Sequence, residues 1–422
     1  MDIYNKITLK NGLRIISIPT KNSNSVTFAV YVKAGSRFEK DNENGLAHFL
    51  EHMAFKGSPK YKTQLDVAKT VEGIGGAWNA GTSEEYIMYF IKAESKHLPL
   101  LNDVLSEMIL RPNLRNEDIE GEKGVICEEI NMYEDDPKDK VVLLSSNITF
   151  SGNPLSRNVA GTKNLVKGFN RKDFVDYREQ FFVPENMVLC VSGNFDDSSI
   201  KKISALWPMR IKELNRSYEK YKNVQEEPTV IIENRKTEQT HFILSFKSYS
   251  NNNPKQFAAN LLSVILGAGI GSRLFQEIRT KRGLAYYVFS SEDPFMDTGV
   301  FAIRAGVTND KMHDAVSASI LELSKIKSGD VSKSELEKAK NLVSGRTTLA
   351  LEDNAQLNEF YALQELLSHK VLTYSEYVKK IRGVTLDDIE NVANEIFRPE
   401  NSNLAIIGPQ KEKGLEDALS II

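Results

Sequence analysis

Residues 45–58 read GLAHFLEHMAFKGS, a stretch of strong helix formers with no breaker before Gly57. His48 and His52 are four positions apart, so on a helix they lie about 40° apart in projection and on neighbouring turns. Both imidazoles can therefore reach one metal ion. Glu51 projects to the flank of that face, where its carboxylate can contact a metal-bound water without binding the metal. The stretch predicts a helix that carries two metal ligands and one acid.

A catalytic zinc ion usually has three protein ligands and one position left for water. The segment 120–136 (EGEKGVICEEINMYEDD) can supply the third ligand as a carboxylate. On a helix Glu122 and Glu129 face the same way within about 20°. One of them can bind the metal while the other holds a histidine ring. Glu128 points about 100° away from Glu129 and is the less favoured ligand.

Each motif also has an ordinary structural explanation. A histidine pair on a helix is more often a surface feature, and a glutamate-rich helix is more often a solvated face. A general base between two histidines, followed by a suitably spaced carboxylate pair, is much harder to obtain by accident. The combination favours a zinc hydrolase.

Length and composition narrow the class of protein. At 422 residues the chain is long enough for two or more domains, and its net charge of −3 gives no reason to expect nucleic acid as a partner. The two cysteines, Cys127 and Cys190, lie in apolar runs and are expected to be reduced core thiols. The N-terminus reads as a first strand with a turn at Asn11-Gly12, and the longest apolar run, 261–271, is too short to span a bilayer. We expect a cytoplasmic protein without a membrane partner.

The same order of elements occurs twice along the chain. Residues 27–33 and 241–247 are strand candidates, and each is followed by a helical stretch, further strands and an amphipathic helix. The segments 181–194 (FFVPENMVLCVSGN) and 396–409 (IFRPENSNLAIIGP) share a Pro-Glu-Asn turn before a closing strand. The order of elements predicts two homologous α+β domains, each a mostly antiparallel sheet covered by helices.

The expected domains are residues 1–211 and 229–422, joined by a charged linker at 212–228 that lacks strand character. The first domain carries the expected metal site. The second has FAANLLSVILG at 257–267 where the first has the histidine motif, so it offers no ligands. We expect one zinc ion per chain.

H-x-x-E-H is the reverse of the common H-E-x-x-H zinc motif and is the inverzincin signature. With this motif, the sequence resembles the family of pitrilysin, insulin-degrading enzyme and the mitochondrial processing peptidase. The resemblance covers nearly the whole chain. It includes the histidine motif, GGAWNAGTSEEY at 75–86, the Glu122–Glu129 spacing and GSRLFQEIRTKRGLAYYV at 271–288.

The resemblance implies a role for particular residues. Glu129 is implied as the third metal ligand and Glu122 as its supporting carboxylate. Arg279 and Tyr286 match a family pair that contacts the substrate and the developing oxyanion.

Two further positions concern the substrate itself. Asn79 and Ala80 match positions that pair with an extended peptide added to the sheet as a strand. This binding mode favours unfolded peptides over folded proteins.

The two-domain length resembles the short bacterial members and the processing-peptidase subunits, which pair two chains into a clamshell. We therefore expect a homodimer in which Arg279 and Tyr286 of one subunit act at the zinc site of the other. The implied activity is a zinc-dependent endopeptidase that hydrolyses unfolded peptides or presequence-like segments in a closed chamber, using a zinc-bound water and Glu51 as general base. A non-catalytic assembly subunit of the same fold is the alternative.

Overall fold

The computed structural model describes residues 4–212, 214, 216–368, 370–410 and 414–420. Its contacts divide the chain into two compact units, each built from three segments of the chain. Unit 1 comprises residues 1–130, 157–219 and 347–376, and unit 2 comprises residues 131–156, 220–346 and 377–422.

Unit 1 contains a six-stranded sheet in the order β1-β2-β6-β3-β5-β4, in which only β2 and β6 run parallel. Strand β4 is one edge of this sheet. The strands are β1 (Asn5–Thr8), β2 (Arg14–Pro19), β3 (Ser25–Val32), β4 (Ala77–Thr82), β5 (Ile87–Glu94) and β6 (Met187–Gly193).

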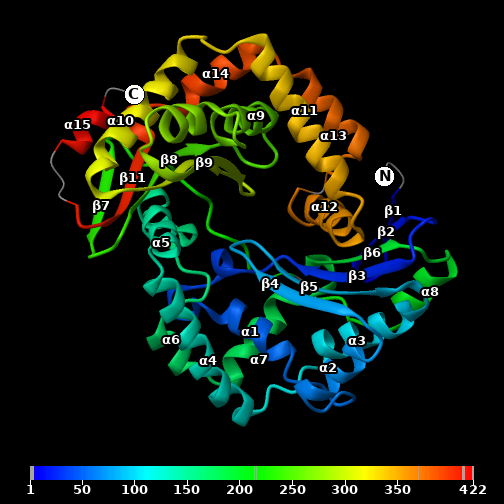
Figure 1. Ribbon diagram of the computed structural model, residues 1–422. Helices are drawn as coiled ribbons and strands as arrows, with labels where there is room; N and C mark the ends of the chain where they lie inside the picture. The colour runs from blue at the N-terminus through cyan, green and yellow to red at the C-terminus, as the bar shows by residue number, and fades with distance from the viewer. Residues whose placement is uncertain (1–3, 213, 215, 369, 411–413, 421–422) are drawn as a thin grey trace. The chain divides into compact units, whose positions relative to one another are not determined.

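Helices cover both faces of this sheet (Figure 1). On one face, α12 (Asn354–Leu367) packs Leu357 and Tyr361 against Ile16, Ala29 and Val188 of the sheet. The helices α1, α3 and α7 lie on the other side. Besides α12, the helices that lie wholly or mostly in unit 1 are α1 (Leu46–Ala54), α2 (Gln64–Glu72), α3 (Leu98–Leu110), α4 (Asn116–Asp135), α6 (Lys163–Gly168), α7 (Arg171–Phe181) and α8 (Ser198–Ala205).

Unit 2 contains a five-stranded sheet in the order β7-β11-β8-β10-β9, with β7 and β11 as its parallel pair. Helix α5 (Pro137–Thr149) packs Val141 and Leu144 against Ile243, Ala405 and Ile407. The strands are β7 (Thr229–Asn234), β8 (Thr240–Ser248), β9 (Ala285–Pro294), β10 (Gly299–Val307) and β11 (Ser402–Gly408). The other helices are α9 (Gln256–Gly267), α10 (Met312–Lys327), α11 (Lys333–Ala350), α13 (Tyr374–Gly383), α14 (Leu386–Ile396) and α15 (Leu415–Leu419).

The two sheets repeat one design, which confirms the predicted α+β fold with mostly antiparallel sheets. Strands β2, β6, β3, β5 and β4 occupy the same order in unit 1 as β7, β11, β8, β10 and β9 in unit 2. The two Pro-Glu-Asn turns form the short 3-10 helices η5 (Pro184–Asn186) and η8 (Pro399–Asn401), each directly before a buried strand.

The units exchange one helix each. Helix α5 comes from the first half of the chain but packs in unit 2, and α12 comes from the second half but packs in unit 1. A unit defined by spatial contacts need not coincide with a domain defined by a sequence repeat. The boundaries 1–211, 212–228 and 229–422 therefore stay a prediction.

Candidate metal centre

Helix α1 begins at a turn that a glycine makes possible. Gly45 has φ 99°, and a Cβ there would lie 2.6 Å from the carbonyl oxygen of Ala160. The carboxylate of buried Glu39 accepts hydrogen bonds from the backbone N–H groups of Gly45 (2.9 Å) and Ala47 (2.7 Å). These contacts satisfy donors that a helix leaves unpaired in its first turn. They fix the start of the helix that carries the histidines.

The apolar side chains of α1 decide which way the histidines face. Leu46, Phe49, Leu50 and Met53 are buried, and the Phe49 ring packs 4.8 Å from that of Phe174 on α7. Residues at i and i+4 share a face of a helix, so burying this set leaves the His48 and His52 face partly exposed.

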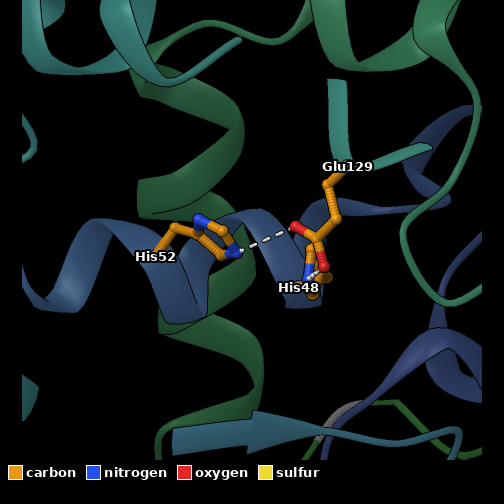
Figure 2. Close-up of side chains that lie close together, drawn as sticks. All are labelled: His48, His52 and Glu129. Carbon is orange, nitrogen blue, oxygen red and sulfur yellow. Dashed lines mark ion pairs between the residues drawn. The ribbon is translucent and has the colours of Figure 1, made fainter. Parts of the chain in front are cut away.

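Glu129 on α4 meets both imidazoles (Figure 2). Its Oε1 lies 3.5 Å from His48 Nε2, and its Oε2 lies 3.5 Å from His52 Nε2. The two imidazole rings are 4.7 Å apart between centroids. One ligand atom from each of the three residues lies within 4.8 Å of the other two. The structure thus brings together His48, His52 and Glu129, the three predicted ligands, from two separate helices.

The second predicted carboxylate of α4 lies behind His52. Glu122 Oε1 is 2.9 Å from His52 Nδ1, and Glu122 Oε2 forms an ion pair with Lys56 Nζ. Burial by itself raises the pKa of Glu122, but the hydrogen bonds from His52 and Lys56 outweigh it and the pKa is lowered. Burial lowers the pKa of His52, but the bond to Glu122 and the nearby carboxylates leave it raised.

Glu51 lies outside this group of three and is held by the sheet. Its Oε2 accepts a hydrogen bond of 2.6 Å from Thr82 Oγ1 at the end of β4. The pKa of the buried Tyr89 hydroxyl is raised, mainly by burial and next by the nearby charge of Glu51. The hydrogen bond from β4 therefore orients Glu51, and Glu129 is the carboxylate that lies between the imidazoles.

The donor set fits zinc. Zinc in catalytic sites is bound by histidine nitrogens and carboxylate oxygens, with three protein ligands. Two imidazoles and one carboxylate converge here, and Glu122 holds the far nitrogen of His52 as outer carboxylates commonly do around metal-binding histidines. Nε2 of His48 is the ring nitrogen that faces Glu129. The other ring nitrogen, Nδ1, is buried and has no hydrogen-bond partner among the described residues.

The predicted substrate residues Asn79 and Ala80 lie on the edge strand β4. Asn79 is exposed, and its Oδ1 accepts the backbone N–H of Ala80 at 2.9 Å. Thr82, the donor to Glu51, ends the same strand. One strand therefore carries both the expected peptide-pairing positions and the contact to the acid.

Arg279 and Tyr286 lie together in unit 2. Arg279 is in a π-helical segment, η6 (Phe275–Lys281), and its Cζ is 5.9 Å from the centre of the Tyr286 ring. In the pairing of β9 with β10, Gly306 faces Tyr287 and Val307 faces Ala285, so the register skips Tyr286. The Tyr286 side chain is 69% exposed. π-Helical turns and β-bulges recur at functional sites, where they re-aim side chains.

Comparisons with known proteins show which family the chain belongs to. Residues 14–163 match the profile of the insulinase family (peptidase family M16), and residues 168–343 match that of the M16 inactive domain. A protein of Streptomyces coelicolor, named an uncharacterized zinc protease, is 33% identical over 97% of this chain and 90% of its own length. This chain belongs to the M16 peptidase family. A second relative of the same description, from Bacillus subtilis, is 32% identical over 96% of this chain and 98% of its own length.

Solved structures share the fold of this chain. A protease from Helicobacter pylori superposes with a TM-score of 0.92 at 25% identity, covering 97% of this chain and all of the other. An M16 inactive domain from Pseudomonas fluorescens gives a TM-score of 0.89 at 17% identity, over 97% of this chain and 98% of the other, which supports the fold alone. Within the described ranges, no helix of this M16 chain has the length and apolar character needed to cross a bilayer.

Sequence reasoning missed three residues around this M16 metal centre. Lys56 could have been found, because it follows His52 by one helical turn and continues the histidine face. Thr82 and Glu39 carry no such signal, since only the folded sheet and the loop before α1 bring them to Glu51 and to the helix start.

Proposed function

We propose that this M16 chain is a zinc-dependent endopeptidase whose metal is held by His48, His52 and Glu129. The observation that carries the proposal is the convergence of these three side chains from α1 and α4. The relatives named zinc proteases support the choice of metal and of reaction. Metal-assisted peptide hydrolysis is the chemistry that this donor set serves best.

A zinc ion bound there would supply Lewis acidity and would make water a better nucleophile near neutral pH. Glu51 takes the proton from the attacking water and passes it to the leaving amine. Glu51 Oε2 already accepts the hydrogen bond from Thr82, so we assign the proton to the other oxygen, Oε1. Glu122 orients His52, and Tyr286 with Arg279 stabilises the oxyanion and binds the substrate.

The substrate is proposed to be an unfolded peptide or a presequence-like segment, bound as a strand beside β4. Support comes from the position of β4 at the sheet edge and from exposed Asn79 on it. An extended chain is needed for strand addition, which disfavours folded proteins. The cytoplasmic location and the single zinc ion per chain stay predictions.

We also propose a homodimer that forms a closed chamber, in which Arg279 and Tyr286 of one subunit serve the metal centre of the other. The described residues of one chain include one converged ligand group and the Arg279–Tyr286 pair, so two identical chains suffice. A non-catalytic assembly subunit is the rival reading. The sequence of this one chain contains the ligand group, Glu51 and the Arg279–Tyr286 pair, and this complete set favours an enzyme.

A quenched peptide library tests the activity. Wild type should cleave it, lose activity with a zinc chelator and regain activity with added Zn²⁺. Glu51→Gln should bind zinc as wild type does but lose about 10²–10⁴-fold in turnover. Hydrolysis by the wild type that persists after complete metal removal would contradict the proposal, and an active Glu51→Gln would remove Glu51 from the mechanism.

A further inference from the structure

Lys56 lies one helical turn beyond His52, just past the end of α1. Its backbone N–H donates to Met53 O at 3.2 Å, so it continues the line of the helix. Its Nζ forms the ion pair with Glu122 Oε2 and donates to Gln64 Oε1 at 3.2 Å. The Lys56 side chain is only 19% exposed. Lys56 therefore pairs with a buried carboxylate. Removing one partner of a buried ion pair costs more free energy than removing one partner of an exposed pair.

Glu122 is held at both of its oxygens. Oε1 meets His52 Nδ1 at 2.9 Å, and Oε2 meets Lys56 Nζ. A carboxylate held at one oxygen alone can rotate about its side-chain torsions, because the terminal torsion of glutamate is broad. The second contact removes that freedom. With Nδ1 of His52 fixed by Glu122, Nε2 of the same ring is aimed at Glu129 Oε2, 3.5 Å away.

The loop after Lys56 has its own attachments to the segment before α4. Gly57 adopts φ 111°, where a Cβ would lie 2.6 Å from Tyr61 O. Asn113 N donates to Gly57 O at 2.9 Å, and Asn113 Nδ2 donates to Lys62 O at 3.1 Å. These hydrogen bonds do not involve the Lys56 side chain. We therefore expect the loop to stay docked when the ion pair is removed.

We propose that Lys56 is a positioning residue of the metal centre. By fixing Glu122 Oε2 it keeps Glu122 Oε1 on His52 Nδ1, and so keeps His52 Nε2 in place for the metal. The proposal rests on the zinc site of the proposed function. It assigns Lys56 an effect on metal affinity that passes through Glu122.

The test is a Zn²⁺ titration against a competing chelator. Lys56→Met keeps the length of the side chain but loses the ion pair, and we expect zinc affinity about tenfold weaker, the lower end for loss of such an outer contact. Lys56→Arg keeps the charge and should bind zinc nearly as wild type does. Lys60→Met is the matched control, because it removes an equal charge from the same loop at a side chain that is 54% exposed and paired with Asp103.

A double-variant cycle tests whether the effect passes through Glu122. In a Glu122→Gln background, Lys56→Met should cause no further loss of zinc affinity. Thermal unfolding of the metal-free proteins checks that all variants fold.

Unchanged zinc affinity in Lys56→Met would overturn the inference, as would equal losses in the wild-type and Glu122→Gln backgrounds. Tighter binding would also overturn it, because that is the result if Lys56 acts only as a positive charge that repels the ion. A wild type that binds no zinc would refute the proposed function itself, and the role of Lys56 with it.

Discussion

Thr82 Oγ1 donates a hydrogen bond of 2.6 Å to Glu51 Oε2. The contact joins the edge strand β4 to helix α1, which carries His48 and His52. In the proposed mechanism β4 receives the peptide and Glu51 handles the proton. The Thr82–Glu51 bond therefore keeps the acid in a fixed position relative to the strand on which the substrate lies.

Replacing Thr82 tests that coupling. Thr82→Val keeps the shape of the side chain but removes the donor, and a hydrogen bond to a charged group contributes about 1.5–3 kcal/mol. We expect kcat to fall about tenfold or more. Zinc affinity should not change, because the hydrogen bond of the Thr82 hydroxyl goes to Glu51. Thr82→Ser retains the hydroxyl and should stay near wild type. Equal kcat values for Thr82→Val and Thr82→Ser would show that the bond does not orient Glu51.

The shared-site dimer predicts complementation between two inactive variants. Glu51→Gln lacks the base, and Tyr286→Phe lacks an oxyanion donor and should lose about 10²–10³-fold in turnover. In a mixed dimer one of the two sites combines an intact Glu51 with an intact Tyr286. Equal co-expression with random pairing gives mixed dimers in about half of the population, so about a quarter of wild-type activity should return.

The controls for this experiment are the two variants expressed alone. If the co-expressed sample shows only the average of the two single-variant activities, Tyr286 does not serve the other subunit. A native mass that corresponds to one chain under assay conditions would contradict the homodimer directly.

Glu39 predicts a pH dependence of stability. Burial raises the pKa of Glu39 from 4.5 to about 7, against the backbone hydrogen bonds from Ala47 and Gly45, which lower it. The folded state therefore favours the protonated carboxyl. The contribution to stability is fully present below pH 4.5 and is lost as the pH rises to about 7. The loss is on the order of 3 kcal/mol.

Urea unfolding at about pH 5 and about pH 8 measures this contribution. Wild type should lose more stability between the two pH values than Glu39→Gln, whose amide does not ionise. The variant gives up one acceptor at the start of α1, so a constant offset is expected at both pH values. An identical pH dependence in both proteins would show that the Glu39 carboxyl does not titrate in this range.

The metal centre was largely predictable from sequence because helix geometry is regular. The spacing of His48 and His52 fixes two ligands on one face, and the spacing of Glu122 and Glu129 offers two carboxylates on another helix. The structure places Glu129 between the imidazoles and Glu122 behind His52. Residue spacing alone left these two positions interchangeable, since either carboxylate could face the ion.

Contacts between distant elements could not be predicted in this way. The hydroxyl of Thr82 reaches Glu51 only because β4 packs beside α1, and periodicity contains no information about that packing. The placement of α5 in unit 2 and of α12 in unit 1 could not be predicted for the same reason. An amphipathic helix shows in its sequence which face is apolar, but not which of two similar sheets will cover it.

Zinc binding by Glu129→Gln and Glu128→Gln shows whether Glu129 is the third metal ligand. The two residues are neighbours on α4, but Glu128 is exposed and Glu129 lies between the imidazoles of His48 and His52. We predict about one zinc ion per wild-type chain, affinity at least tenfold weaker in Glu129→Gln and wild-type affinity in Glu128→Gln. Wild-type zinc affinity in Glu129→Gln would show that Glu129 does not bind the metal.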